Sequence, residues 1–476
     1  MNNAPTAASN KNLILAIATT TSFILPFLVA SVNIALPTMG RELNMEAVVM
    51  TWVSTSYFLA IAVVQVPFGR LSDILGRRRL FIIGLAISTL GSFLGGFANS
   101  VPVLMLSRVL QGFGSGMTFN VAVAILSSVF PGKERARALG ISQSGTYLGL
   151  SLGPLFGGFL TEHLGWKSIF LISGGLGTLL VLLVIIGLRT EWRDARGEKF
   201  DMRGSFIYMI GIASFMYGFG TLTTAPGIAL FIIGIAALAL FIWWENRTPN
   251  PVFNISLFRS NRVFIFSNLA ALITYLSTFA ITTLLSFYLQ YIKKLSPDRA
   301  GLVLICASVL MTTFTIISGF IAKRVDSRML ATLGMGIDLI ATVMLIFLGA
   351  DTSLWYVILA LMIYGTGIGL FVSPNTNAIM GSVDNKVLGV ASGTLGTMRT
   401  VGMMLSMDIT MVLFAIYIGQ AEITSAYYPQ FLTSVRVGFI IFSACGLGGV
   451  IAQLIARNRD VTRSKNLISP TPESRH

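Results

Sequence analysis

Apolar residues run along this chain in long stretches, separated by short segments that carry charge, proline or glycine. A helix needs about 20 mostly apolar residues to cross a bilayer, and fourteen stretches are long enough. They lie at 13–37, 49–68, 80–98, 102–129, 139–161, 168–188, 204–222, 226–244, 263–290, 299–321, 330–349, 354–379, 388–417 and 433–455. The pattern therefore predicts an all-α membrane protein with fourteen transmembrane helices. No cleavage-site pattern follows the first stretch, so we expect a retained helix and not a signal peptide.

Composition and charge placement agree with a membrane location. Apolar residues make up 54% of the 476 positions and charged residues only 11%, against roughly 25% charged residues in soluble proteins. Of the 33 Lys and Arg, 25 lie on the termini and the even-numbered connections, and five lie on the odd-numbered ones. This positive-inside alternation predicts a cell-membrane protein with both termini in the cytoplasm. It also explains the net charge of +14 without a nucleic-acid partner.

Residues suited to metal binding or histidine chemistry are scarce. Cys306 and Cys445 fall inside predicted helices, and His163 and His476 are the only histidines. We therefore expect no metal, no cofactor and no enzymatic activity. The expected partners are the lipid bilayer and a small molecule, and the expected state is a monomer.

Two polar breaks, at 189–203 and 245–259, divide the predicted helices into groups of six, two and six. The segment 319–328 is a degraded copy of the segment 69–79 at the corresponding place in the other half. Parallel halves of this kind are typical of transporters that rock two bundles around a central site. The predicted domains are a six-helix bundle at 1–190, a linker with two extra helices at 191–259, and a second six-helix bundle with a short cytoplasmic tail at 260–476.

Glycines recur every four residues in the fifth apolar stretch, at Gly145, Gly149, Gly153 and Gly157. On a helix they form one stripe without side chains, and Pro154 beside the stripe removes a helix hydrogen bond. Such a face suits a helix that packs tightly on a partner and shifts during a working cycle. Simple close packing of two helices is the alternative explanation.

The segment 69–79 combines turn residues with charge. Gly69 and Gly76 permit a tight turn, and Asp73 can pair with Arg77 or Arg78. The alternative is a basic loop that only sets the topology.

Three charged residues stand inside predicted helices at positions of interest. Arg108 is costly in a membrane unless it faces a partner or water, although it could snorkel or bind helix carbonyls instead. Asp338 and Asp408 are the only acids within the predicted helices. A carboxylate there can load and release a proton or attract a cation. Asp408 is the preferred carrier, because Asp338 is predicted to lie closer to a helix end and to be a buried polar contact.

Several of these motifs resemble those of the major facilitator superfamily. The spacing of Gly140, Gly149, Gly153, Pro154, Gly157 and Gly158 resembles the antiporter motif of its drug exporters, complete at every position. The 69–79 segment resembles the superfamily's loop motif, and 106–114 resembles its R-x-x-q-G-x-g motif. The run from Asn33 to Pro37 resembles the signature of the fourteen-helix drug:proton antiporter family, the QacA/EmrB-like group. In that family an acid normally precedes the asparagine by five residues, where this chain has Leu28.

The resemblance implies export of hydrophobic, cationic compounds in exchange for protons, by alternating access about a midplane site. Asp408 or Asp338 would carry the proton, Arg108 would tune that carboxylate, and the 69–79 loop would latch one access state by contacting the opposite half. A metabolite exporter or a uniporter without proton coupling is the first alternative, which Leu28 favours. A sensor or scaffold that moves nothing is the second. The candidate substrate-lining residues are Asn33, Gln65, Gln111, Gln290 and Asn375.

Overall fold

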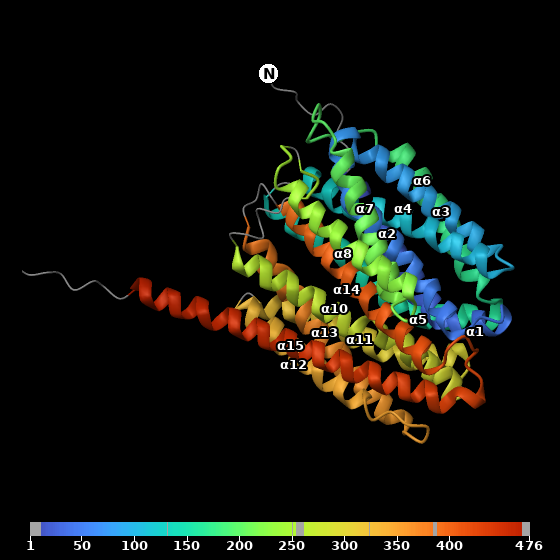
Figure 1. Cartoon of the computed structure of the whole chain (residues 1–476). Helices are drawn as coiled ribbons and strands as arrows, with labels where there is room; N and C mark the ends of the chain where they lie inside the picture. Colours follow the sequence, from blue (N-terminus) through green and yellow to red (C-terminus); the bar gives the residue numbers. More distant parts are fainter. Residues whose placement is uncertain are drawn as a thin grey trace, which may run out of the picture.

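The computed structural model describes residues 11–130, 132–249, 251–253, 261–322, 324–383 and 388–468. The predicted tail beyond residue 468, the first ten residues, and residues 250 and 254–259 of the second polar break lie outside the described residues. Fourteen long α-helices of the described part run side by side in one bundle (Figure 1). They are α1 (Lys11–Glu42), α2 (Ala47–Leu75), α3 (Arg77–Gly96), α4 (Val101–Val129), α5 (Gly132–Leu164), α6 (Lys167–Gly187), α7 (Met202–Gly220), α8 (Ala225–Glu245), α10 (Arg262–Phe287), α11 (Pro297–Ile321), α12 (Ser327–Leu345), α13 (Leu354–Gly381), α14 (Leu388–Tyr417) and α15 (Tyr428–Ile468).

Twelve helices among the described residues are long and apolar enough to cross a membrane. The two long helices outside that set are α5 and α7. Glycine, serine and a charged first turn dilute the apolar residues of α5, and glycine, serine, tyrosine and Arg203 dilute those of α7. The structure thus supports an all-helical membrane fold, whereas fourteen crossings remain a prediction.

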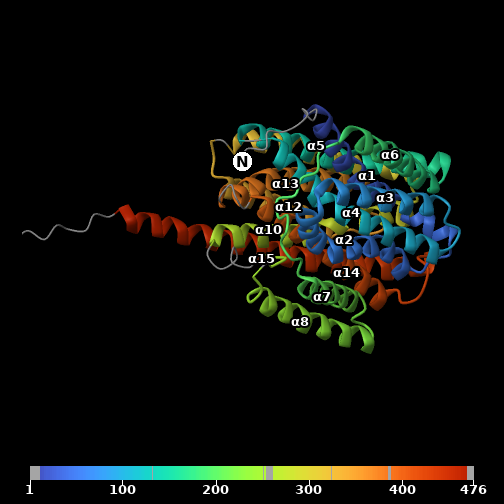
Figure 2. The ribbon, with the colours of Figure 1, turned by 90° about the horizontal axis from the view of Figure 1, so that it is seen from above.

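Helices α1–α6, called here the N-half, pack mainly on one another, and α10–α15, the C-half, do the same. The α7–α8 hairpin lies at the edge of the bundle, where α7 contacts α2 and α14 (Figure 2). Tyr208 of α7 donates a hydrogen bond to the carbonyl oxygen of Ala62 at 2.9 Å. Trp52 of α2 packs on Tyr217, with ring centroids 5.2 Å apart. The hairpin is therefore attached where the two halves meet.

The described chain begins and finishes at the same end of the bundle, called here the terminal end, and α15 projects beyond it (Figure 1). At the opposite end, the far end, one hydrophobic core includes residues of both halves, such as Leu36, Met50, Leu289, Leu304 and Phe431. Toward the terminal end the buried residues fall into separate clusters. One lies in the N-half, one lies mostly in the C-half, and one is shared by the hairpin with α2 and α14. The two halves are thus joined most firmly at the far end.

Candidate functional site

The far end is sealed by polar contacts across the two halves. The C-half contributes a π-helical turn at Tyr288–Ile292, directly after α10. Gln290 in that turn donates from Nε2 to the carbonyl oxygen of Ile34 at 2.8 Å, and Ser286 donates to the carbonyl oxygen of Asn33 at 3.2 Å. The Asn33 side chain accepts a hydrogen bond from Ser54 at 2.7 Å. Asn33 and Gln290, expected as substrate-lining residues, therefore lie in this seal.

The glycine stripe of α5 packs on α1 of its own half. A Cβ built on Gly149 would lie 2.3 Å from the carbonyl oxygen of Phe23, and one on Gly157 would lie 2.5 Å from Cα of Ser31. Gly145 and Gly153 face α1 in the same way, whereas Gly140 has nothing within 4 Å. Bare glycines allow the two backbones to touch. The partner of the stripe is therefore α1 of the same half, and movement along this face stays a prediction.

Two other glycines carry the contact between halves. A Cβ on Gly158 of α5 would lie 2.4 Å from the carbonyl oxygen of Pro297. A Cβ on Gly301 of α11 would lie 2.3 Å from the carbonyl oxygen of Pro154. The backbones of α5 and α11 thus meet directly near the far end. Ser151 of α5 adds a hydrogen bond to the carbonyl oxygen of Ser308 at 3.0 Å.

The 69–79 loop closes on the linker that follows α6. Gly76 has a φ of 123°, which favours glycine, and it joins α2 directly to α3. Arg77 donates to Asp73 at 2.7 Å and pairs with Asp194 of the linker at 2.7 Å. The backbone N–H of Arg78 donates to Glu191 at 2.8 Å.

The remaining loop contacts also stay within the N-half and the linker. Ser72 donates to the carbonyl oxygen of Gly69 at 2.7 Å, and the N–H of Ala195 donates to the carbonyl oxygen of Asp73 at 3.1 Å. A latch onto the opposite half was expected. Among the described residues this loop binds the linker instead, because the linker supplies the acidic side chains.

Arg108 lies fully buried within the N-half. It donates to the carbonyl oxygen of Val53 at 2.9 Å and to Gln111 at 2.7 Å, and its guanidinium lies 4.4 Å from the ring centroid of Tyr57. Gln111 in turn donates a hydrogen bond from Nε2 to the Ser92 hydroxyl at 3.0 Å. No described ion pair joins Arg108 to a carboxylate. In this state Arg108 and Gln111 organise the N-half.

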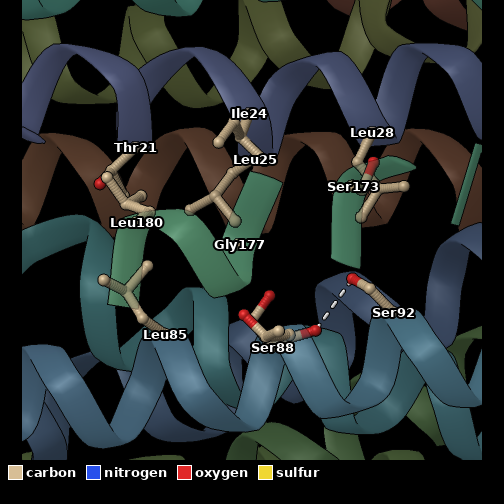
Figure 3. A pocket seen from close by; sticks show the side chains of 11 residues that line it. Thr21, Ile24, Leu25, Leu28, Leu85, Ser88, Ser92, Ser173, Gly177 and Leu180 are labelled. Carbon is tan, nitrogen blue, oxygen red and sulfur yellow. Dashed lines mark hydrogen bonds between the residues drawn. The ribbon is translucent and has the colours of Figure 1, made fainter. Parts of the chain in front are cut away.

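A small cavity of about 20 Å³ lies between α1, α3 and α6 of the N-half. It is large enough for one water, which needs ~10–15 Å³. Figure 3 shows Ser88, Ser92 and Ser173 around this gap, with Leu28 on its wall. The Ser173 hydroxyl is buried without a hydrogen-bond partner. Leu28, at the position where the fourteen-helix drug:proton antiporter family normally has an acid, thus lines a cavity that also has hydroxyl groups. Its side chain makes that part of the wall apolar.

The two membrane carboxylates lie apart from Arg108 and from the seal. Asp408 is fully buried on α14, both of its oxygens lack partners, and Oδ1 lies 3.3 Å from the Cβ position of Gly220 in α7. It therefore faces the hairpin. Asp338 is 4% exposed, and its Oδ1 has no partner. Asp338 lies in α12, where its backbone packs against Gly367 of α13, and it is nearer to an end of its helix than Asp408 is.

Arg399 of α14 is not among the candidate site residues predicted from the sequence, yet it lies where the two halves meet. It donates to Thr376 of α13 at 3.0 Å and lies 5.6 Å from the ring centroid of Tyr275 in α10. Tyr147, from α5 of the N-half, is near enough to interact electrostatically with it. The signal that could have found this residue is the cost of a guanidinium in a membrane.

Two of the expected lining residues lie beside this group. Gln65 of α2 accepts a hydrogen bond from Thr400, the residue after Arg399, at 3.1 Å. Asn375 precedes Thr376 and is 2% exposed, with an unpartnered Oδ1. Among the described residues no cluster of His, Cys, Asp or Glu is suited to a metal ion.

Curated relatives cover most of the chain. The riboflavin transporter RibZ of Clostridioides difficile is 29% identical over 439 residues, which cover 90% of this chain and 94% of that protein. The multidrug resistance protein Stp of Mycobacterium tuberculosis is 30% identical over 82% of this chain and 73% of its own length. Both names describe membrane transport or resistance, and neither describes an enzyme.

The fold and the family agree with these relatives. The structure matches the crystal structure of a bacterial homologue of the human lysosomal transporter Spinster with a TM-score of 0.67 at 16% identity, over 94% of this chain and 98% of that chain. The model of the Major Facilitator Superfamily matches residues 18–407. The protein is therefore a multi-pass membrane transporter of small molecules, and the chain belongs to the major facilitator superfamily.

Proposed function

We propose that this transporter exports hydrophobic small molecules in exchange for protons, by alternating access between the N-half and the C-half. The observation that carries the proposal is the pair of buried carboxylates, Asp408 and Asp338, each with an oxygen that lacks a partner. A charge without a partner is expensive in the membrane interior, so such a group gains by holding a proton. Release of that proton requires a change in its surroundings, which alternating access supplies.

The sealed far end supports the second part of the proposal. The distribution of Lys and Arg assigns the terminal end to the cytoplasm. On that assignment, the structure corresponds to the state closed to the outside. Opening the far end must break the hydrogen bonds of Gln290 and Ser286 to the N-half and separate Gly158 from Pro297. Each of these contacts joins one half to the other, so they report on the state of the cycle.

The relatives support transport but leave two substrate classes open. The name of the Stp protein supports multidrug efflux. The name of RibZ supports transport of a single metabolite, and the apolar Leu28 in place of an acid favours that second candidate without proton coupling. Flux that continues after the pH gradient is collapsed would identify the second candidate.

The test is flux into proteoliposomes under an imposed pH gradient, with a dye inside the vesicles to report proton movement. The transported probes are fluorescein, rhodamine 123 and riboflavin. Asp408→Asn and Asp338→Asn each remove one carboxylate. Asp351→Asn is the matched control, because Asp351 is exposed in the loop after α12.

The expected result is probe flux coupled to proton movement in the wild type and in Asp351→Asn. Coupling should be lost in Asp408→Asn, in Asp338→Asn or in both, while downhill probe exchange is retained. Full coupling in both variants would contradict the assignment of the proton carriers. Absence of flux for every probe in the wild type would contradict the proposed transport of hydrophobic compounds.

A further inference from the structure

Arg399 is a positive charge at the boundary between the two halves, and it has no carboxylate partner. None of the six ion pairs formed by the described residues includes it. Its only described hydrogen bond is from one terminal nitrogen to Thr376 at 3.0 Å, and its Nε is buried without an acceptor. The guanidinium therefore has an unused donor in the interior of the protein, which costs free energy.

Aromatic rings from both halves surround this cation. Tyr275 of α10 presents its ring with the centroid 5.6 Å from the guanidinium carbon. Tyr147 approaches from α5 of the N-half, although its own buried neighbours belong mostly to the C-half. Tyr364 of α13 lies close to Tyr275. The group thus combines a cation with flat apolar surfaces, and its members come from four helices.

A purely structural role accounts for only part of this arrangement. One hydrogen bond and one ring contact hold the side chain in place, but they leave the Nε donor unused. The Arg399 side chain as a whole is only partly buried. The two membrane carboxylates are not its partners, because Asp408 faces Gly220 of the hairpin and Asp338 packs at the α12–α13 boundary. No described side chain supplies an acceptor for the Nε donor.

We propose that Arg399 binds an anionic group, a carboxylate or a phenolate, of an aromatic substrate whose rings pack against Tyr147 and Tyr275. Guanidinium binds such groups through two parallel N–H donors, which here are Nε and a terminal nitrogen. The site should therefore prefer anionic substrates, whereas the family resemblance implies cationic ones. A cation would be repelled by the positive charge of Arg399. A ligand held between Tyr147 of one half and Arg399 of the other draws the halves together, so its binding energy is tied to their movement.

This proposal rests on the proposed transport function, and binding is measured apart from flux so that each can fail alone. The full chain is placed in lipid nanodiscs, and fluorescence anisotropy reports the binding of fluorescein and rhodamine 123. The two dyes share a three-ring core but carry opposite net charge at mildly alkaline pH. The wild type should bind fluorescein more tightly. This comparison requires no variant and remains valid if a variant does not fold.

Three substitutions separate charge from ring packing. Arg399→Gln should weaken fluorescein binding by at least about tenfold, with little change for rhodamine 123. Arg399→Lys should recover part of the loss. Tyr147→Ala should weaken both dyes to a similar degree, because rings pack regardless of charge. Arg436→Gln is the matched control, since it removes the same charge from an exposed position on α15 and should leave both affinities unchanged.

Tighter binding of rhodamine 123 by the wild type would overturn the proposal. Equal losses for both dyes in Arg399→Gln, or the same loss in Arg436→Gln, would overturn it as well. Fluorescein binding that depends on Arg399 but leads to no flux in vesicles would leave the anion site standing and contradict the transport of this class.

Discussion

Replacing Gly158 by alanine is expected to open the far end without unfolding the protein. The added Cβ would lie 2.4 Å from the carbonyl oxygen of Pro297, whereas ordinary contacts begin at 3.4 Å. The backbones of α5 and α11 must therefore move apart by about 1 Å at the point where the two halves touch. Forcing extra atoms into a packed contact costs about 1–3 kcal/mol. Because this contact exists only in the closed state, the open state gains by roughly 5–150-fold in relative population.

The matched control is Gly149→Ala on the same helix. Its Cβ would lie 2.3 Å from the carbonyl oxygen of Phe23, so the clash is of similar size. Phe23 belongs to α1 of the same half, and the α1–α5 contact is expected to persist in every access state. This variant should therefore lower the melting temperature Tm and leave the balance between closed and open states nearly unchanged.

The assay is the distance between spin labels at Arg41→Cys and Glu422→Cys, with Cys306 and Cys445 replaced by serine. Both labelled positions lie at the far end near Tyr291, one in each half. Gly158→Ala should add a population with a longer distance. Gly149→Ala should retain the wild-type distribution. The reasoning is refuted if both variants lower Tm equally and neither changes the distances.

Three further predictions use contacts described above. Gln290→Leu removes one hydrogen bond of the seal, worth about 1 kcal/mol, and should shift the same spin-label distances toward the open state; an unchanged distribution would mean that this bond does not hold the halves. Arg77→Gln loses the contacts to Asp73 and Asp194, so trypsin should cut faster at the exposed Arg196, and an unchanged cleavage rate would contradict the linker contact. Trp166→Phe removes the hydrogen bond to Glu42 at 2.6 Å and should lower Tm without changing the spin-label distances.

The sequence was sufficient for the helices and the family, because both depend on local patterns. Long apolar stretches predict membrane helices directly, and the expected 354–379 stretch corresponds closely to α13 at Leu354–Gly381. The superfamily resemblance is confirmed by the family match over residues 18–407. The domain boundaries near 190 and 260 and the fourteen crossings stay predictions.

The partners of the motifs could not be read from the sequence, because they depend on packing between distant segments. A stripe of glycines predicts that another backbone comes close. It does not tell whether that backbone belongs to α1, as it does here, or to the opposite half. The charges of the 69–79 loop allow an ion pair with any acidic segment, and the structure selects Asp194 of the linker. Arg399 becomes a candidate binding residue only through its neighbours Tyr147 and Tyr275, which lie far from it in the sequence.

The shared core at the far end has a thermal consequence. It joins buried apolar residues from most helices of both halves, Leu36, Leu289 and Phe431 among them. Separating the halves there would hydrate that apolar surface, and such hydration raises the heat capacity. The equilibrium between the two access states should therefore curve with temperature. Since apolar association weakens in the cold, chilling should favour separation of the halves at the far end even without any change to a polar side chain of the seal.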